Sequence, residues 1–68
     1  MSSYYVNKRA QENGDNEVHR FDCKYLPIPE NRMCLGEFDN CSDAVRKAKQ
    51  LYPKADGCAT CSPECHKS

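Results

Sequence analysis

Six cysteines in a chain of 68 residues constrain this protein more than any other feature. A chain this short buries little apolar surface, so its folding usually depends on disulfides, a bound metal or another chain. Only 38% of the residues are hydrophobic and none is tryptophan, which limits the core further. We therefore expect residues 1–68 to form a single small domain that its cysteines stabilise, either as metal ligands or as disulfides.

The start of the chain bears on how the cysteines are used. Residues 1–9 contain no apolar run and no small-residue cleavage site of the kind found in signal peptides. We therefore expect a cytoplasmic protein, in which thiols stay reduced and clustered Cys and His residues bind metal. The alternative is a mature secreted domain whose cysteines form disulfides. No apolar run approaches the roughly 20 residues of a membrane span, so no membrane association is expected.

Asn13-Gly14 is the strongest local signal, because both residues tolerate the positive φ that a type I′ hairpin turn requires. As a two-residue loop it pairs Val6 with Phe21 and predicts strands near residues 4–11 and 16–21. Side chains alternate across a strand, so one set shares the core face of this hairpin. That set is Tyr4, Val6, Ala10, Phe21 and Cys23.

A third strand and one helix follow the hairpin. Residues 33–38 predict a short strand that contains Cys34 as a buried thiol, with a bulge or bend at Gly36. Apolar residues at helical spacing predict a helix over 41–52 that Asn40 caps. Its inner face comprises Ala44, Val45, Ala48, Leu51 and Tyr52, with Cys41 as a buried structural thiol. The predicted fold is α+β: a small antiparallel sheet, made of the N-terminal β-hairpin and a short strand, packs with one helix and a terminal cysteine knuckle.

The knuckle contains Cys58-x-x-Cys61, a spacing at which a tight turn directs two thiolates at one metal ion. Redox dithiols use the same spacing, so a redox or metal-handling protein is an alternative interpretation. A tetrahedral zinc site needs two more ligands, and the natural pair is His19 and Cys23. On a straight strand these residues would lie about 13 Å apart, whereas ligand atoms on one zinc lie within about 4 Å. The pair therefore fits only if the strand ends near Arg20 and residues 21–22 form a turn.

Four further candidate ligands leave alternatives open. Cys65 and His66 are neighbours and could replace His19 or Cys23 in the site. They could also form a second site with Cys34 and Cys41.

Three segments in this order resemble the zinc-binding module of the bacterial Ada DNA-repair protein and its relatives. They are Val18-His19-Arg20-Phe21-Asp22-Cys23, Phe38-Asp39-Asn40-Cys41-Ser42-Asp43-Ala44 and Cys58-Ala59-Thr60-Cys61. The resemblance covers roughly residues 18–61 and implies one zinc held by His19, Cys23, Cys58 and Cys61. In that family the first ligand position is the thiolate that accepts a methyl group from a DNA phosphotriester. Here the position is His19, so the methyl-transfer activity is not expected to carry over.

Charge and the remaining residues bear on function. Ten basic and ten acidic residues balance, so the positive field on which nonspecific nucleic-acid binding rests is absent. The one local basic patch, interpreted as a solvated helix face or a contact surface, comprises Arg46, Lys47, Lys49 and Lys54. No acid/base pair or phosphate loop is recognisable. We therefore expect a non-enzymatic, monomeric zinc module that binds a protein partner, with weak or absent nucleic-acid binding.

Overall fold

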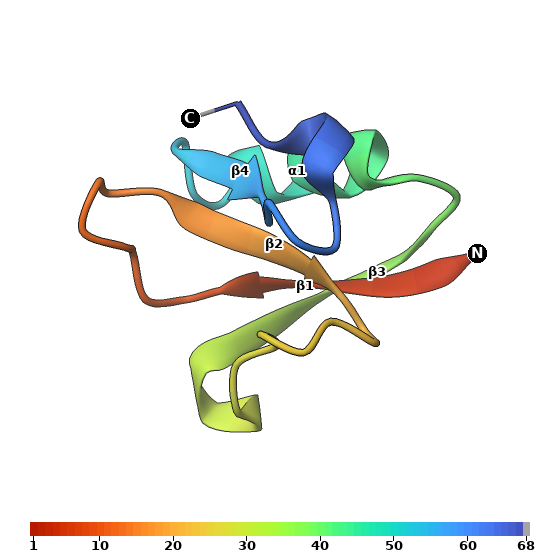
Figure 1. The fold of residues 1–68 in the computed structure, drawn as a ribbon, viewed down its shortest axis with the longest axis horizontal. Coiled ribbons are helices and arrows are strands. Elements are labelled where there is room, and N and C mark those ends of the chain that lie inside the picture. Colours follow the sequence, from red (N-terminus) through yellow and green to blue (C-terminus); the bar gives the residue numbers. More distant parts are fainter. Residues whose placement is uncertain (68) are drawn as a thin grey trace.

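The computed structural model describes residues 1–67 and has the α+β fold expected from the sequence: a four-stranded sheet packed with one helix. The elements in chain order are β1 (Ser2–Asn7), β2 (Asn16–Arg20), η1 (a 3₁₀ turn at Pro29–Asn31), β3 (Arg32–Phe38), α1 (Cys41–Lys49), β4 (Ala55–Gly57) and η2 (a 3₁₀ turn at Pro63–Cys65) (Figure 1).

The sheet is mixed, with the strand order β3-β1-β2-β4. β1 runs antiparallel to both of its neighbours, whereas β2 and β4 are parallel. Helix α1 and η2 lie on the side of β4 in Figure 1, away from η1. β4 was not predicted, because a strand of three residues is too short to show an alternating pattern. It matters for function because it carries the cysteine knuckle to the side of β2.

The predicted two-residue turn at Asn13-Gly14 is wrong. The backbone N–H of Gln11 donates to the carbonyl of Asp15 at 2.9 Å, so three residues form the loop between them. Gly14 alone has a positive φ, of 90°, as in a turn followed by a left-handed glycine. Asn13 keeps a negative φ because its side-chain oxygen accepts the N–H of Asp15 at 2.9 Å. This side-chain bond selects the longer loop.

The register of the hairpin changes by more than the longer loop alone requires. With Gln11 opposite Asp15, Val6 would face Arg20, but it pairs with Val18 rather than with the predicted Phe21. Residues 8–10 leave the ladder, and the side-chain amide of Asn16 donates to the Asn7 carbonyl at 3.1 Å where the strands diverge. As a result Val18 is fully buried, whereas Phe21 is 55% exposed and Ala10 is exposed too. The predicted core positions of Phe21 and Ala10 are therefore wrong, while those of Tyr4, Val6 and Cys23 are confirmed.

The third strand and the helix match their predictions more closely. Gly36 adopts a φ of 110° where the β1–β3 register shifts, which is the predicted bulge. Asn40 caps α1, since its side-chain oxygen accepts the N–H of Asp43 at 2.9 Å. The helix ends at Lys49, before Pro53, so Leu51 lies beyond it and is exposed. Ala44, Val45 and Ala48 are buried as predicted, and Tyr52 packs against the core.

Candidate metal centre

The pairing of β2 with β4 brings the two predicted ligand pairs together. Val18 lies opposite Gly57, and the backbone N–H of Cys58 donates to the Val18 carbonyl at 3.0 Å. His19 and Cys58 each follow one of these paired residues, so they lie side by side. One ligand atom from each of His19, Cys23, Cys58 and Cys61 falls in a cluster whose members all lie within 4.8 Å of one another. The structure therefore contains a Cys/His cluster that could hold a metal ion.

A turn directly after β2 brings Cys23 back to His19. β2 ends at Arg20, and the N–H of Cys23 donates to the Arg20 carbonyl at 2.9 Å. The Arg20 side chain donates to the Asp22 carboxylate at 2.6 Å across the same turn. Because the chain reverses here, the Nδ1 atom of His19 and the Sγ atom of Cys23 are 3.5 Å apart. The predicted turn at residues 21–22 is confirmed.

A second turn forms the knuckle that carries Cys58 and Cys61. It is closed by the N–H of Ser62, which donates to the Cys58 carbonyl at 2.8 Å. The backbone N–H of Arg20 points at the Sγ atom of Cys61 from 3.4 Å. An N–H group at this distance stabilises a thiolate and fixes the orientation of a sulfur ligand. The β2 turn and the knuckle therefore support each other's ligands.

The atomic separations fit a tetrahedral zinc ion. With Zn–S bonds of about 2.3 Å and a Zn–N bond of about 2.05 Å, tetrahedral angles place two sulfurs about 3.8 Å apart and a nitrogen and a sulfur about 3.6 Å apart. The His19–Cys23 distance is 3.5 Å, and the Cys23–Cys58 sulfur distance is 3.9 Å. The sulfur–sulfur distance is too long for a disulfide bond, and both distances match edges of the tetrahedron.

Burial sets the protonation of the cluster. His19 is 1% exposed, and this burial lowers its pKa, so the imidazole is neutral and keeps a lone pair for a metal. Burial raises the pKa of Cys23 to about 12, and the neighbouring Cys61 thiol adds to the rise. Without a cation the Cys23 thiol therefore stays protonated at neutral pH. A divalent metal reverses this preference, because it binds the thiolate.

Glu17 is a residue near the site that the sequence analysis missed. Its carboxylate oxygen lies 3.7 Å from the Nε2 atom of His19, while the Nδ1 atom faces the cysteines. A carboxylate on the far side of a histidine ligand orients the ring and strengthens it as a ligand. The sequence could have indicated this neighbour of His19, because Glu17 and His19 are two residues apart and side chains two apart on a strand lie on the same face.

The remaining cysteines do not take the predicted roles. Cys41 forms a disulfide with Cys65, so the prediction that it is a free thiol is wrong. This bond also removes Cys65 as a replacement ligand in the cluster. His66 is occupied elsewhere, with its Nδ1 atom 3.0 Å from the Gly57 carbonyl. Cys34 lies in β3 as predicted but is exposed rather than buried. It belongs to neither metal-ligand cluster within residues 1–67, so a second site containing Cys34 is not formed.

The predicted basic patch is divided between two places on the surface. Lys54 donates to the Asn13 carbonyl at 3.1 Å and so lies at the hairpin loop. Arg46 and Lys49 line a pocket beside the start of α1, and Lys47 is exposed on the same helix. Their predicted role as a contact surface stays a prediction.

Comparisons with known protein families, with curated proteins and with solved structures found no match to this chain. The resemblance to the Ada zinc module therefore stays a prediction. Within residues 1–67, no helix is long and apolar enough to cross a membrane.

Proposed function

We propose that this protein is a zinc-stabilised, non-enzymatic module that binds another protein, with one zinc ion held by His19, Cys23, Cys58 and Cys61. The observation that carries the proposal is the cluster of four ligand-type atoms within 4.8 Å of one another, in which two separations, 3.5 and 3.9 Å, equal edges of a tetrahedral zinc site. Four protein ligands fill the zinc coordination shell, so no position remains for a substrate or an attacking water. Such sites are structural rather than catalytic.

The ligands indicate what the zinc would stabilise. Two come from β2 and its turn, and two come from the knuckle after β4, so the metal would tie the last part of the chain to the sheet. Structural zinc contributes roughly 10–16 kcal/mol to the folding of small metal-dependent domains. That is more than the net stability expected of a core this small.

A redox function for the Cys58 and Cys61 pair is less well supported. A redox dithiol needs two sulfurs that form a disulfide with each other, with little else in contact. Here a third sulfur, from Cys23, lies 3.9 Å from Cys58, and an imidazole nitrogen completes the group. This crowding favours a shared metal.

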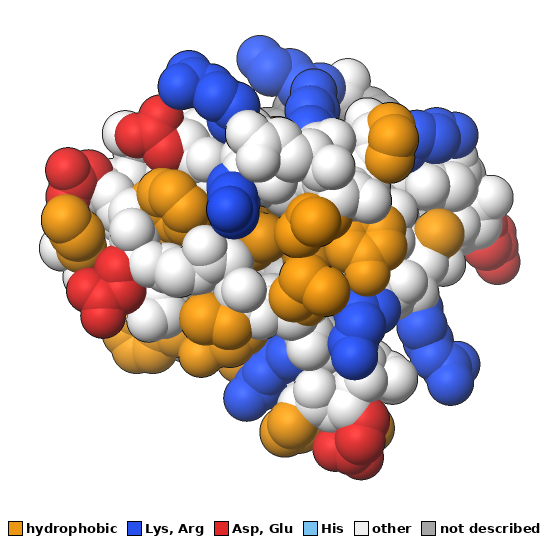
Figure 2. Space-filling model, turned by 180° about the vertical axis from the view of Figure 1, so that it is seen from behind, with side chains coloured by type: hydrophobic (Ala, Val, Ile, Leu, Met, Phe, Trp, Pro, Cys, Tyr) orange, Lys and Arg blue, Asp and Glu red, His pale blue; other side chains and the backbone are white. Residues whose placement is uncertain are grey.

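The surface supports a protein partner. Figure 2 shows hydrophobic side chains gathered near the centre of one face, with Lys and Arg side chains around them. The segment from the β2 turn to the start of β3 exposes Phe21, Tyr25, Ile28 and Met33. A gathered apolar surface such as that in Figure 2 is typical of interaction sites, whereas the zero net charge disfavours nucleic acid. A monomeric state belongs to the same proposal, and so does a cytoplasmic location, where the Cys41–Cys65 disulfide would be open to reduction.

Zinc stoichiometry, measured by native mass spectrometry on the full chain, tests the metal centre. With the Cys41–Cys65 disulfide intact, we expect one zinc per chain, lost in Cys58→Ser and retained in Cys34→Ser, which is the matched control because Cys34 is exposed and outside the cluster. Removal of the zinc with a chelator should abolish the circular dichroism signal of the sheet. Equal zinc binding by the two variants, or an unchanged spectrum after verified zinc removal, would refute the proposal.

A further inference from the structure

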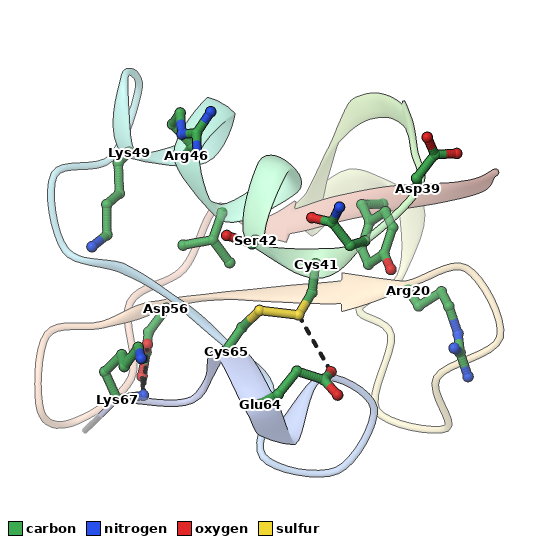
Figure 3. A pocket seen from close by; sticks show the side chains of 13 residues that line it. Arg20, Asp39, Cys41, Ser42, Arg46, Lys49, Asp56, Glu64, Cys65 and Lys67 are labelled. Carbon is green, nitrogen blue, oxygen red and sulfur yellow. Dashed lines mark hydrogen bonds between the residues drawn. A yellow bond between two sulfur atoms is a disulfide. The ribbon is translucent and has the colours of Figure 1, made fainter.

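A second group of ligand-type atoms lies where the start of α1 meets η2. The sulfurs of Cys41 and Cys65 and a carboxylate oxygen of Glu64 all lie within 4.8 Å of one another. Figure 3 shows the Glu64 carboxylate directed at the Cys41 sulfur, at a distance of 3.4 Å. Both cysteines are buried, and the group lines a pocket of about 680 Å³. None of these atoms belongs to the His19 cluster.

The geometry around the two sulfurs suits a metal once their bond is broken. A zinc ion requires about 3.8 Å between two sulfur ligands and about 3.6 Å between a sulfur and a carboxylate oxygen. The oxygen of Glu64 is already close to that distance from Cys41. The Cα atoms of Cys41 and Cys65 are 6.3 Å apart, a spacing compatible with two sulfurs about 3.8 Å apart on one zinc ion.

The surroundings favour the thiolate forms that a metal binds. Cys41 is the first residue of α1, where the unpaired N–H groups of the helix stabilise negative charge. Four basic residues of the same pocket, Arg20, Arg46, Lys49 and Lys67, add positive charge, although the carboxylates of Asp39, Asp56 and Glu64 offset part of it.

We propose that reduction of the Cys41–Cys65 disulfide creates a second zinc site, in which Cys41, Cys65 and Glu64 are the ligands and the fourth position opens into the pocket. A thiol reductant supplies two electrons and two protons: the S–S bond breaks, two cysteine thiols form, and the reductant becomes a disulfide. Zinc then binds both sulfurs and two protons leave. The oxidised protein lacks this site because its sulfurs are bonded to each other.

The two sites would differ in character. The His19 cluster has four protein ligands and is closed, whereas the second site has three and accepts water or an anion from the pocket. Zinc stoichiometry would therefore depend on the redox state of the chain, with one ion in the oxidised protein and two in the reduced protein. The two ligand sets share no residue, so separate substitutions address each site.

The test is a zinc titration of the full chain before and after reduction with an immobilised phosphine, which leaves no competing thiol in solution. We expect one equivalent before reduction and two after it. Glu64→Gln, which keeps both cysteines, should lower the affinity of the reduced protein for the second zinc ion at least about tenfold. Glu37→Gln, which removes an exposed carboxylate of β3, is the matched control and should bind as the wild type does.

A double variant assigns the equivalents to their sites. Cys41→Ser/Cys65→Ser should bind one zinc ion, in the His19 cluster, under both conditions. If a variant is poorly folded, the absorption of Co²⁺ in the reduced wild type distinguishes a site with three sulfurs from one with two. A single equivalent after complete reduction, or a second equivalent that survives in the double variant, would overturn the inference. Loss of the first equivalent alone would count against the proposed function and not against this second site.

Discussion

Replacing Val18 by alanine is expected to destabilise the protein far more than replacing Phe21, although phenylalanine is the larger side chain. Val18 is fully buried between the sheet and α1, so the substitution removes two buried carbon groups at about 0.8 kcal/mol each and leaves a cavity. The free energy of unfolding should fall by about 2 kcal/mol. Phe21 is 55% exposed, so Phe21→Ala should cost less than about 1 kcal/mol.

Urea and thermal unfolding of both variants, with the same metal content, measure this difference. For a domain of this size each kcal/mol shifts the midpoint by about 4–8 °C, so Val18→Ala should melt roughly 8–16 °C below the wild type. A hairpin with a two-residue loop would place Phe21 in the core, where its loss would cost about 3–5 kcal/mol. A larger cost for Phe21→Ala than for Val18→Ala would therefore refute the register described above.

Three further predictions concern the cysteines and their neighbours. Zinc binding should release at least one proton per chain and become tighter as pH rises, because burial holds the pKa of Cys23 at about 12 and the metal binds only the thiolate. Calorimetry in two buffers of different ionisation enthalpy measures the number of protons released. If no proton is released, Cys23 is not a ligand. Glu17→Gln should weaken zinc binding about tenfold without changing the stoichiometry, because the carboxylate orients the His19 ring and is not itself a ligand. A competition titration measures the affinity, and an unchanged value would mean that Glu17 does not orient His19. Replacing Cys41 and Cys65 together by serine should lower the free energy of unfolding by about 3 kcal/mol, because the disulfide closes a loop between residues 24 positions apart. Urea unfolding without reductant measures this difference. Wild-type stability of the double variant would show that the disulfide does not constrain the unfolded chain.

The elements that the sequence predicts well are those fixed by neighbouring residues. Asn40 caps α1 and Ala44 and Ala48 face the core because both signals act within a few turns of helix. The ligand cluster was also predictable, because the spacing of each pair limits the turns that can join its members. His19 and Cys23 required a chain reversal, and Asp22 is a residue that favours turns.

The elements that the sequence predicts poorly depend on contacts that no local pattern encodes. Asn13-Gly14 is compatible with loops of two or three residues, and a side-chain bond to Asp15 decides between them. The pairing of β4 with β2 and the bond between Cys41 and Cys65 join segments distant in the chain. For such contacts residue types permit many partners, and only the assembled fold selects one.

The placement of the ligands has a consequence for how the protein is made. His19 and Cys23 leave the ribosome early, but Cys58 and Cys61 follow only after β1, β2, β3 and α1 have been synthesised. A nascent chain therefore has two of the four ligands for most of its synthesis and cannot hold zinc tightly. Cys58 directly follows β4, so the segment that completes the cluster also adds the last strand to the sheet. A ligand that binds only the folded chain stabilises it, so zinc bound in the cluster would also favour the pairing of β4 with β2.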